Sequence, residues 1–175
     1  MFFLKMIIFH SIIILSLCAN DFKDIQTFEA NFTQTITNPS RNKVSYSGIL
    51  HIQEPNFIRW EYIKPIKKFV YIKKYTIVII EPELEQAIVT KIDKEINILN
   101  LLKTSQKISD EMYISTFNNT KYTLTINNKL LKKISYKDEL ENSINIYFKN
   151  IKQNHTIHKN IFKFYIPVDY DIIKK

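Results

Sequence analysis

The stretch GILHIQEPNFIRWEYIKP (residues 48–65) alternates apolar and polar side chains on both sides of a proline. Before the proline one side carries Leu50 and Ile52, continuing from Tyr46 and Gly48; after it the same pattern gives Ile58, Trp60 and Tyr62. A period of two is typical of a strand with one buried face. Pro55 fixes its own φ and favours an extended Glu54, so the centre indicates a turn. The stretch predicts a β-hairpin with one apolar, inward-facing side.

Further strand candidates, rich in β-branched and aromatic residues, lie on both sides of this hairpin. They span residues 28–37, 69–72, 76–80, 86–92, 112–117, 121–126, 129–136, 143–149 and 161–166. The pairs Asn118-Asn119 and Asn127-Asn128 are typical of tight hairpin turns. Strands and helices do not alternate regularly, which argues against a parallel sheet and favours a strongly curved antiparallel one.

One segment, residues 93–110, breaks the strand pattern. Ile96, Leu99 and Leu102 are spaced by three, and Ile98, Leu101 and Leu102 by three and four. Such spacing is typical of a helix, for which Asp93 would be a suitable N-cap. The segment predicts a helix over 94–108 with a wide apolar stripe, placed as a lid over the sheet.

The spacing Gly-x-Leu-x-Ile-x-x-Pro-x-Phe-x-x-Trp-x-Tyr-x-x-Pro in residues 48–65 resembles the signature of the LolA family, the periplasmic carriers of outer-membrane lipoproteins. Segments 28–34, 82–86 and 162–173 match in the same order, so the resemblance covers nearly all of the chain after residue 20. It implies a mainly β fold with few helices: an incomplete, half-open antiparallel β-barrel covered by a helical lid.

The resemblance also implies a function, in which the cavity of the barrel takes the acyl chains of a lipoprotein. Each methylene shielded from water contributes ~0.8 kcal/mol, so bare acyl chains cannot cross an aqueous space. The expected partners are acylated lipoproteins, the inner-membrane ATP-binding-cassette complex that releases them, and either an outer-membrane receptor or the outer membrane itself as acceptor. We expect a monomer without a cofactor. The candidate acyl-chain cavity is lined by Leu50, Ile52, Ile58, Trp60, Tyr62, Ile98, Leu99, Leu101 and Leu102.

Other functions remain open at this level. The apolar faces on their own favour an ordinary filled core, and it is the resemblance that favours a cavity. A LolB-like lipoprotein receptor or an RseB-like lipoprotein sensor would share the fold, although RseB-like proteins carry a second domain for which too few residues remain. A lipid-processing enzyme is disfavoured, because no Gly-x-Ser-x-Gly motif, phosphate loop or other catalytic constellation is present. We therefore expect no catalytic residues.

One position departs from the family. LolA proteins commonly carry an arginine just before the hairpin proline, where it hydrogen-bonds to the lid, whereas this chain has Glu54. A carboxylate only accepts hydrogen bonds, so Glu54 would pair with Lys94 or Lys103, accept N–H groups at a helix start, or point to solvent. Arg59 lies on the face opposite Trp60 and is not expected to replace the arginine. Glu54 is thus the candidate lid latch.

The N-terminus suggests export. An apolar run over residues 6–17 follows Lys5 and ends at Cys18-Ala19, which predicts a signal peptide over 1–19 and a single periplasmic domain over 20–175. A retained anchor is one alternative, although the run is shorter than the ~20 residues that a spanning helix needs. A lipobox ending at Cys18 is another, with Leu17 where processing prefers a small residue.

The net charge and the histidines bear on possible partners and on metal binding. A formal net charge of +8 fits either a solvated lysine-rich surface or attraction to anionic headgroups or an acidic partner. The lysines are scattered, which argues against nucleic acid. His155 and His158 have a spacing that metal ligands can use, but no carboxylate or thiolate nearby completes a set, so we expect a solvated turn and no metal.

Overall fold

The computed structural model describes residues 22–91 and 97–175. The expected signal peptide over 1–19 with Cys18, and the expected roles of Asp93, Lys94 and Ile96, lie outside the described residues.

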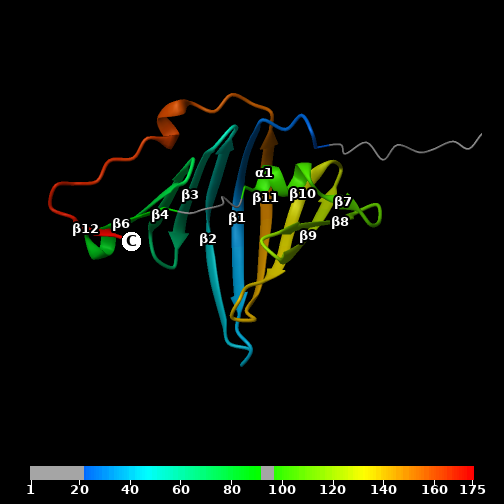
Figure 1. Ribbon diagram of the computed structural model, residues 1–175, viewed down its shortest axis with the longest axis horizontal. Coiled ribbons are helices and arrows are strands. Elements are labelled where there is room, and N and C mark those ends of the chain that lie inside the picture. The colour runs from blue at the N-terminus through cyan, green and yellow to red at the C-terminus, as the bar shows by residue number, and fades with distance from the viewer. Residues whose placement is uncertain (1–21, 92–96) are drawn as a thin grey trace, which may run out of the picture.

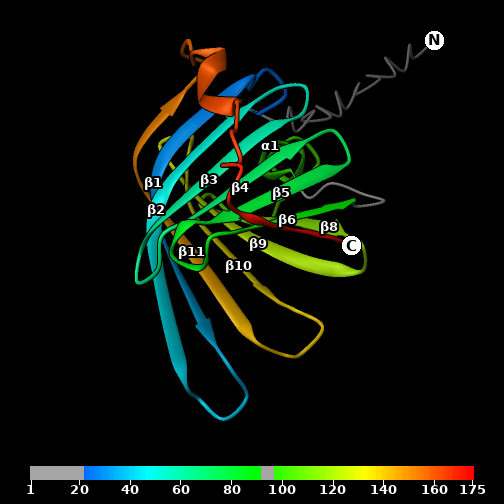
Figure 2. The same cartoon turned by 90° about the vertical axis from the view of Figure 1, so that its left-hand side faces the viewer.

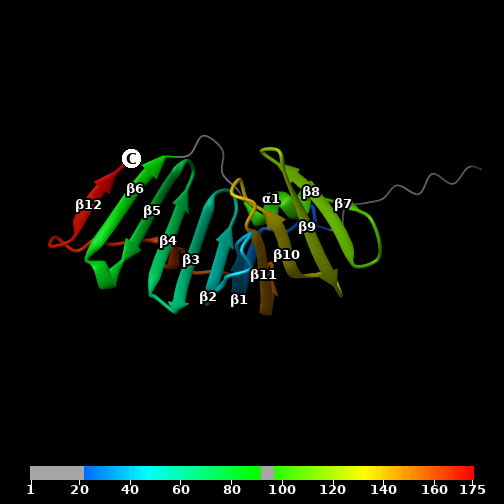
Figure 3. The same ribbon diagram turned by 90° about the horizontal axis from the view of Figure 1, so that it is seen from below.

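Twelve strands of the described chain form one sheet in the order β12-β6-β5-β4-β3-β2-β1-β11-β10-β9-β8-β7 (Figure 1). Their bounds are β1 Thr27–Thr37, β2 Lys43–Gln53, β3 Phe57–Lys64, β4 Lys68–Lys73, β5 Thr76–Glu81, β6 Gln86–Lys91, β7 Gln106–Lys107, β8 Met112–Phe117, β9 Thr120–Asn127, β10 Leu130–Lys137, β11 Ser143–Gln153 and β12 Asp171–Lys174. Seen from below, the strands fan along a curve whose two edges, β12 and β7, do not meet (Figure 3). The open, half-barrel sheet expected from the sequence is confirmed.

The sheet is antiparallel except at one edge. β12 pairs with β6 in parallel, so the expectation of a purely antiparallel sheet is wrong for this short strand. β12 reaches that edge because residues 154–170 cross the outside of the sheet first (Figure 2).

The central hairpin has the predicted faces. Leu50 on β2 lies opposite Trp60 on β3, and Ile52 lies opposite Ile58. Leu50, Ile52 and Ile58 are buried, because their side of the hairpin faces the interior of the curved sheet. Residues that pair across neighbouring strands share a face, so following the pairing from strand to strand assigns the faces of the rest of the sheet.

The helix that covers the concave face is shorter than predicted. α1 spans Ile98–Lys103 and is capped by Asn97, whose side chain accepts a hydrogen bond from the Leu99 N–H. The prediction that the helix continues to 108 is wrong. The hydroxyls of Thr104 and Ser105 bond back to the last carbonyls of the helix, and Gln106–Lys107 then pairs with β8 as β7.

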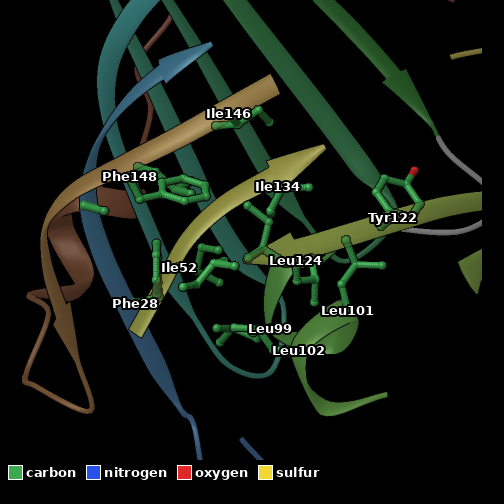
Figure 4. Packing of buried hydrophobic residues seen from close by; sticks show 14 of the residues in the cluster. Phe28, Ile52, Leu99, Leu101, Leu102, Tyr122, Leu124, Ile134, Ile146 and Phe148 are labelled. Atoms are coloured by element: carbon green, nitrogen blue, oxygen red, sulfur yellow. The ribbon is translucent and has the colours of Figure 1, made fainter. Parts of the chain in front are cut away.

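The main core fills the space between α1 and the concave face (Figure 4). Leu99 and Leu102 of α1 are fully buried and lie near Ile52, Leu124 and Ile134 of the sheet (Figure 4). Since all four apolar residues of α1 are buried, the helix is a part of the core in this state.

A second, smaller core lies on the convex face. It consists of Val78, Ile80 and Ala87, packed against Ile166 and Tyr170 of the crossing C-terminal segment. The predicted strand over 161–166 is wrong. Its first residues belong to a 3-10 helix, η2 (Lys159–Phe162), and the rest crosses the sheet unpaired because both neighbours of each underlying strand are already taken.

Two hairpin turns are made by asparagines, as predicted, with one shift. Asn118 and Asn119 have φ values of 47° and 61° between β8 and β9. Between β9 and β10 the central residues are Asn128 and Lys129, with φ of 50° and 60°, one position later than expected. Positive φ at both central residues suits the twist of a tight hairpin, and asparagine tolerates it better than other side chains. A further 3-10 turn, η1 (Pro82–Leu84), joins β5 to β6.

No helix of the described residues has the length and apolar content needed to cross a membrane.

Candidate functional site

A cavity of about 230 Å³ lies between the concave face and α1. Its lining comes from seven strands and the helix: Gln34, Ile52, Ile58, Trp60, Tyr62, Ile72, Ile98, Leu101, Tyr122, Ile134, Tyr136 and Ile146. None of these side chains carries a formal charge at neutral pH, so the cavity offers an apolar wall with a few neutral polar groups.

The central hairpin supplies the aromatic wall. Trp60 and Tyr62 are half-buried at alternate positions of β3, where the period of two turns both towards the cavity. The Phe32 ring meets both edge-on, at centroid distances of 4.9 Å from Trp60 and 5.1 Å from Tyr62. Edge-to-face contacts of this kind fix ring orientation, so the wall is ordered.

Gly48 makes room for this aromatic group. A Cβ at Gly48 would lie 1.8 Å from the carbonyl oxygen of Glu61 and 2.9 Å from Cε1 of Phe32. The β2–β3 register shifts at this point, and the Phe32 ring covers the space that a side chain would need. Gly48 is the single glycine of the chain, and its position here is a packing requirement.

The polar groups of the cavity stay neutral. Tyr62 donates a hydrogen bond of 3.2 Å to Oε1 of Gln34. Burial raises the pKa of Tyr62 to about 12, and burial likewise raises the pKa of Tyr136 to about 12. Both phenols therefore remain protonated and neutral at any physiological pH.

Six predicted residues, Ile52, Ile58, Trp60, Tyr62, Ile98 and Leu101, line the cavity. Leu50, Leu99 and Leu102 lie deeper in the core and do not reach it. Sequence reasoning missed Gln34, Ile72, Tyr122, Ile134, Tyr136 and Ile146. Their alternation within the predicted strands marks them as one face, but only the three-dimensional curvature shows that this face meets the hairpin. That the cavity binds acyl chains stays a prediction.

The apolar face continues beyond the cavity towards the β12 edge. Trp60 pairs with Val70, Val70 with Ile79, Ile79 with Ile88, and Ile88 with Ile173, each on the next strand of the sheet. These four residues beyond Trp60 are only half-buried or, for Ile173, exposed. A row of accessible aliphatic side chains thus extends from the cavity across four strands.

Glu54 forms an ion pair with α1 from the β2–β3 turn. Its Oε1 lies 3.1 Å from Nζ of Lys103 in the last turn of the helix, one of the pairings expected from the sequence. Lys94, the other expected partner, lies outside the described residues. Arg59 points to the convex face and pairs with Glu61 at 2.7 Å, so it takes no part in this contact. That the Glu54 pair acts as a latch stays a prediction.

A histidine cluster lies on the convex face behind the hairpin. Oε2 of Glu29 lies 3.2 Å from Nε2 of His155 and 3.6 Å from Nε2 of His51, and its Oε1 lies 2.9 Å from Nζ of Lys152. Burial lowers the pKa of His51, an effect that Glu29 opposes and Arg59 reinforces. Among the residues described, no three His, Cys, Asp or Glu side chains are grouped as metal ligands.

Sequence comparison matches the chain to a known family. The model of the outer membrane lipoprotein carrier protein LolA matches residues 23–123, more than half of the chain. The outer-membrane lipoprotein carrier protein of Campylobacter jejuni is 34% identical over 86% of this chain and 88% of its own length. That of Wolinella succinogenes is 32% identical over 88% and 90%.

Two solved structures share the fold at 8% sequence identity. An uncharacterized conserved protein from Thermus thermophilus aligns with a TM-score of 0.52 over 86% of this chain and 91% of its own. A DUF1329 family protein from Desulfovibrio piger aligns with a TM-score of 0.51 over 82% and 92%. Likeness at such low identity shows the fold alone, whereas the sequence matches decide the family. The chain belongs to the LolA family of outer membrane lipoprotein carrier proteins.

Proposed function

We propose that this protein is a periplasmic carrier that holds the acyl chains of lipoproteins between the concave face of its sheet and α1. The observation that supports this most is the uncharged cavity, whose wall combines the aromatic residues of β3 with Ile98 and Leu101 of the helix. Relatives that bear the name outer-membrane lipoprotein carrier protein align with more than four-fifths of this chain. An acyl chain needs no polar recognition beyond the mouth of such a cavity.

The cavity must open before it can take several chains. Its volume of about 230 Å³ is below the roughly 300–1,000 Å³ typical of small-molecule sites. Ile98 and Leu101 are buried against the sheet, so moving α1 aside would expose the apolar face they now cover. Each acyl methylene that replaces those contacts regains ~0.8 kcal/mol, which offsets the contacts that the helix gives up. α1 is thus a lid that the cargo displaces.

The open aliphatic row gives the chains a way in. Val70, Ile79 and Ile88 lie on the concave face beside the cavity and are already accessible. A chain that first lies on this row shields it from water and can then extend under α1. This route requires no step of bond breaking, so the protein acts without catalysis.

The route of transport follows from this function. A signal peptide over 1–19 would export a single domain of residues 20–175, which would act as a monomer. It would accept lipoproteins from an inner-membrane ATP-binding-cassette complex and deliver them to the outer membrane, with or without a receptor there.

Mixing the purified mature protein with proteoliposomes that contain a triacylated lipoprotein and its releasing complex tests the proposal. We expect a soluble one-to-one complex in which mass spectrometry finds all acyl chains intact, and which then gives up its lipoprotein to acceptor vesicles. Cleaved chains would indicate a lipid-processing enzyme. A complex that never passes its lipoprotein on would favour a sensor, and no complex at all would rule out a carrier.

A further inference from the structure

A second hollow, of about 620 Å³, is lined by residues of the β4–β5 hairpin and of the C-terminal segment. Figure 2 shows how this segment crosses the outside of the sheet. Its apolar floor is formed by Tyr71 and Val78, which pair with each other across β4 and β5, and by Phe162 and Phe164 of the crossing segment. The rings of Tyr71 and Phe164 are 5.5 Å apart. We call this hollow the outer groove.

The outer groove belongs to the other side of the sheet from the cavity under α1. Tyr71 and Val78 alternate with Ile72 and Ile77, which face the concave side. Val78 is a member of the separate convex core, together with Ile80 and Ala87. Ile72 is the one residue that lines both hollows, and the rest of the outer groove's lining lies outside the cavity. An inference about the outer groove does not depend on the proposed lipoprotein function.

The charge of the outer groove is positive. Lys73, Lys74 and Lys91 line it, and its described lining holds no aspartate or glutamate. Within the described chain none of these three lysines forms an ion pair, and the nearest recorded partner of Lys73 is the Phe57 ring, 5.6 Å from its Nζ. Three ammonium groups beside an apolar floor attract an anion that carries an apolar body.

We propose that the outer groove binds a single-chain anionic amphiphile, with its acyl chain on the aromatic floor and its head group between Lys73, Lys74 and Lys91. The volume falls within the roughly 300–1,000 Å³ of small-molecule sites, which suits one chain. An acidic peptide is a poorer fit, because β4 and β5 are paired on both sides and offer no free edge for its backbone.

A photoreactive palmitic acid with a diazirine on its chain is the probe that tests this proposal. We expect irradiation of the mature protein to label peptides with Tyr71, Phe162 or Phe164. Palmitate should compete for this labelling, and methyl palmitate, which lacks the charge, should not. Label found only on peptides with Ile58, Trp60 or Leu101 would place the fatty acid in the cavity and overturn the proposal.

Charge reversal tests the role of the lysines. In Lys74→Glu/Lys91→Glu we expect labelling of the outer groove to fall at least about tenfold, because charge-assisted contacts to the carboxylate are lost. The matched control, Lys43→Glu/Lys149→Glu, makes the same change of net charge at exposed positions on β2 and β11 and should leave labelling unchanged. Circular dichroism shows whether each variant is folded. Equal labelling in both double variants, or binding to anionic vesicles without any labelling by the monomeric probe, would contradict the proposal.

Discussion

Oε1 of Glu54 lies 3.1 Å from Nζ of Lys103, so one ion pair joins the β2–β3 turn to the end of α1. Both side chains are about three-quarters buried, and a cleft of about 300 Å³ beside the turn reaches Asn97 and Asn100 of the helix. A carboxylate thus stands where the family commonly has an arginine, and a lysine of the helix provides the donor. If α1 is the lid, as we propose, this contact would hold it with reversed polarity.

Removing either partner should loosen the lid. We expect Glu54→Gln and Lys103→Gln each to speed lipoprotein loading by roughly two- to fivefold, since a partly exposed pair contributes about 0.2–1 kcal/mol. The double variant should load no faster than the single ones, because the two residues act through one contact. Loading rates from the proteoliposome assay measure both effects.

The matched control is Lys137→Gln, which removes a pair with Glu141 of 2.8 Å in the β10–β11 hairpin, away from α1. It should load at the parent rate. Effects that simply add in the Glu54/Lys103 double variant would contradict a latch.

A charge placed on the cavity wall should block loading. In Tyr136→Arg a half-buried neutral side chain becomes a cation on an otherwise uncharged wall. A bound acyl chain would displace water from this cation and offers it no hydrogen bond in return, which is unfavourable. We expect loading to fall at least about tenfold while circular dichroism is unchanged. Thr33→Arg, at an exposed position on β1, is the control and should load normally. Normal loading by Tyr136→Arg would mean that the chains bind elsewhere.

Gly48→Ala should destabilise the fold. The new Cβ would collide with the backbone of Glu61 and with the Phe32 ring, neither of which can move without disturbing the hairpin. We expect the free energy of unfolding to drop by about 1–3 kcal/mol or more in urea titration. Ser47→Ala, one residue earlier, should change it by less than about 0.5 kcal/mol. Similar values for the two variants would show that the close approach at Gly48 is unimportant.

The faces of the central hairpin could be predicted from the sequence because period-two alternation is a local property. The C-terminal end of α1 could not be predicted in this way. Ile108 continues the apolar spacing, but the hydroxyls of Thr104 and Ser105 and the pairing of Gln106–Lys107 with β8 end the helix earlier. Local hydrogen bonds and strand pairing outweigh periodicity there.

The side of the cavity opposite the hairpin could not be predicted from the sequence either. Tyr122 and Ile146 lie on predicted strands, but which strands meet the hairpin depends on the order and curvature of the whole sheet. The path of the C-terminal segment over the convex face could not be predicted from the sequence for the same reason. Its alternating Phe162 and Phe164 indicate a strand, yet they contact Phe57 and Tyr71 from outside the sheet.

Stability should fall on mild acidification because of His51. Its imidazole is buried and its pKa is lowered below the ordinary 6.5, so the unfolded chain binds the proton more readily than the folded one. The free energy of unfolding should therefore decrease as the pH falls below about 6.5, until the lowered pKa is passed. The pKa of Glu29 is lowered below 4.5, chiefly by its bond to Lys152, so its own loss of stability begins only at lower pH.

His51→Gln should flatten this decrease between pH 7 and pH 5 in urea titrations. His158→Gln, at an exposed position of the crossing segment, should leave it unchanged. An equal slope in the parent protein and in His51→Gln would assign the pH dependence to another group.

Trp60 offers the most direct test of whether the acyl chains enter the cavity. It is the single tryptophan of the chain and lines the cavity beside Ile58 and Tyr62, so its fluorescence reports on this site alone. The measurement is the emission of the mature protein loaded with a lipoprotein whose acyl chains carry bromine, compared with the same lipoprotein without bromine. We predict that the brominated chains strongly quench Trp60, because they lie against its ring. A soluble complex in which both lipoproteins leave the emission equal would contradict the account.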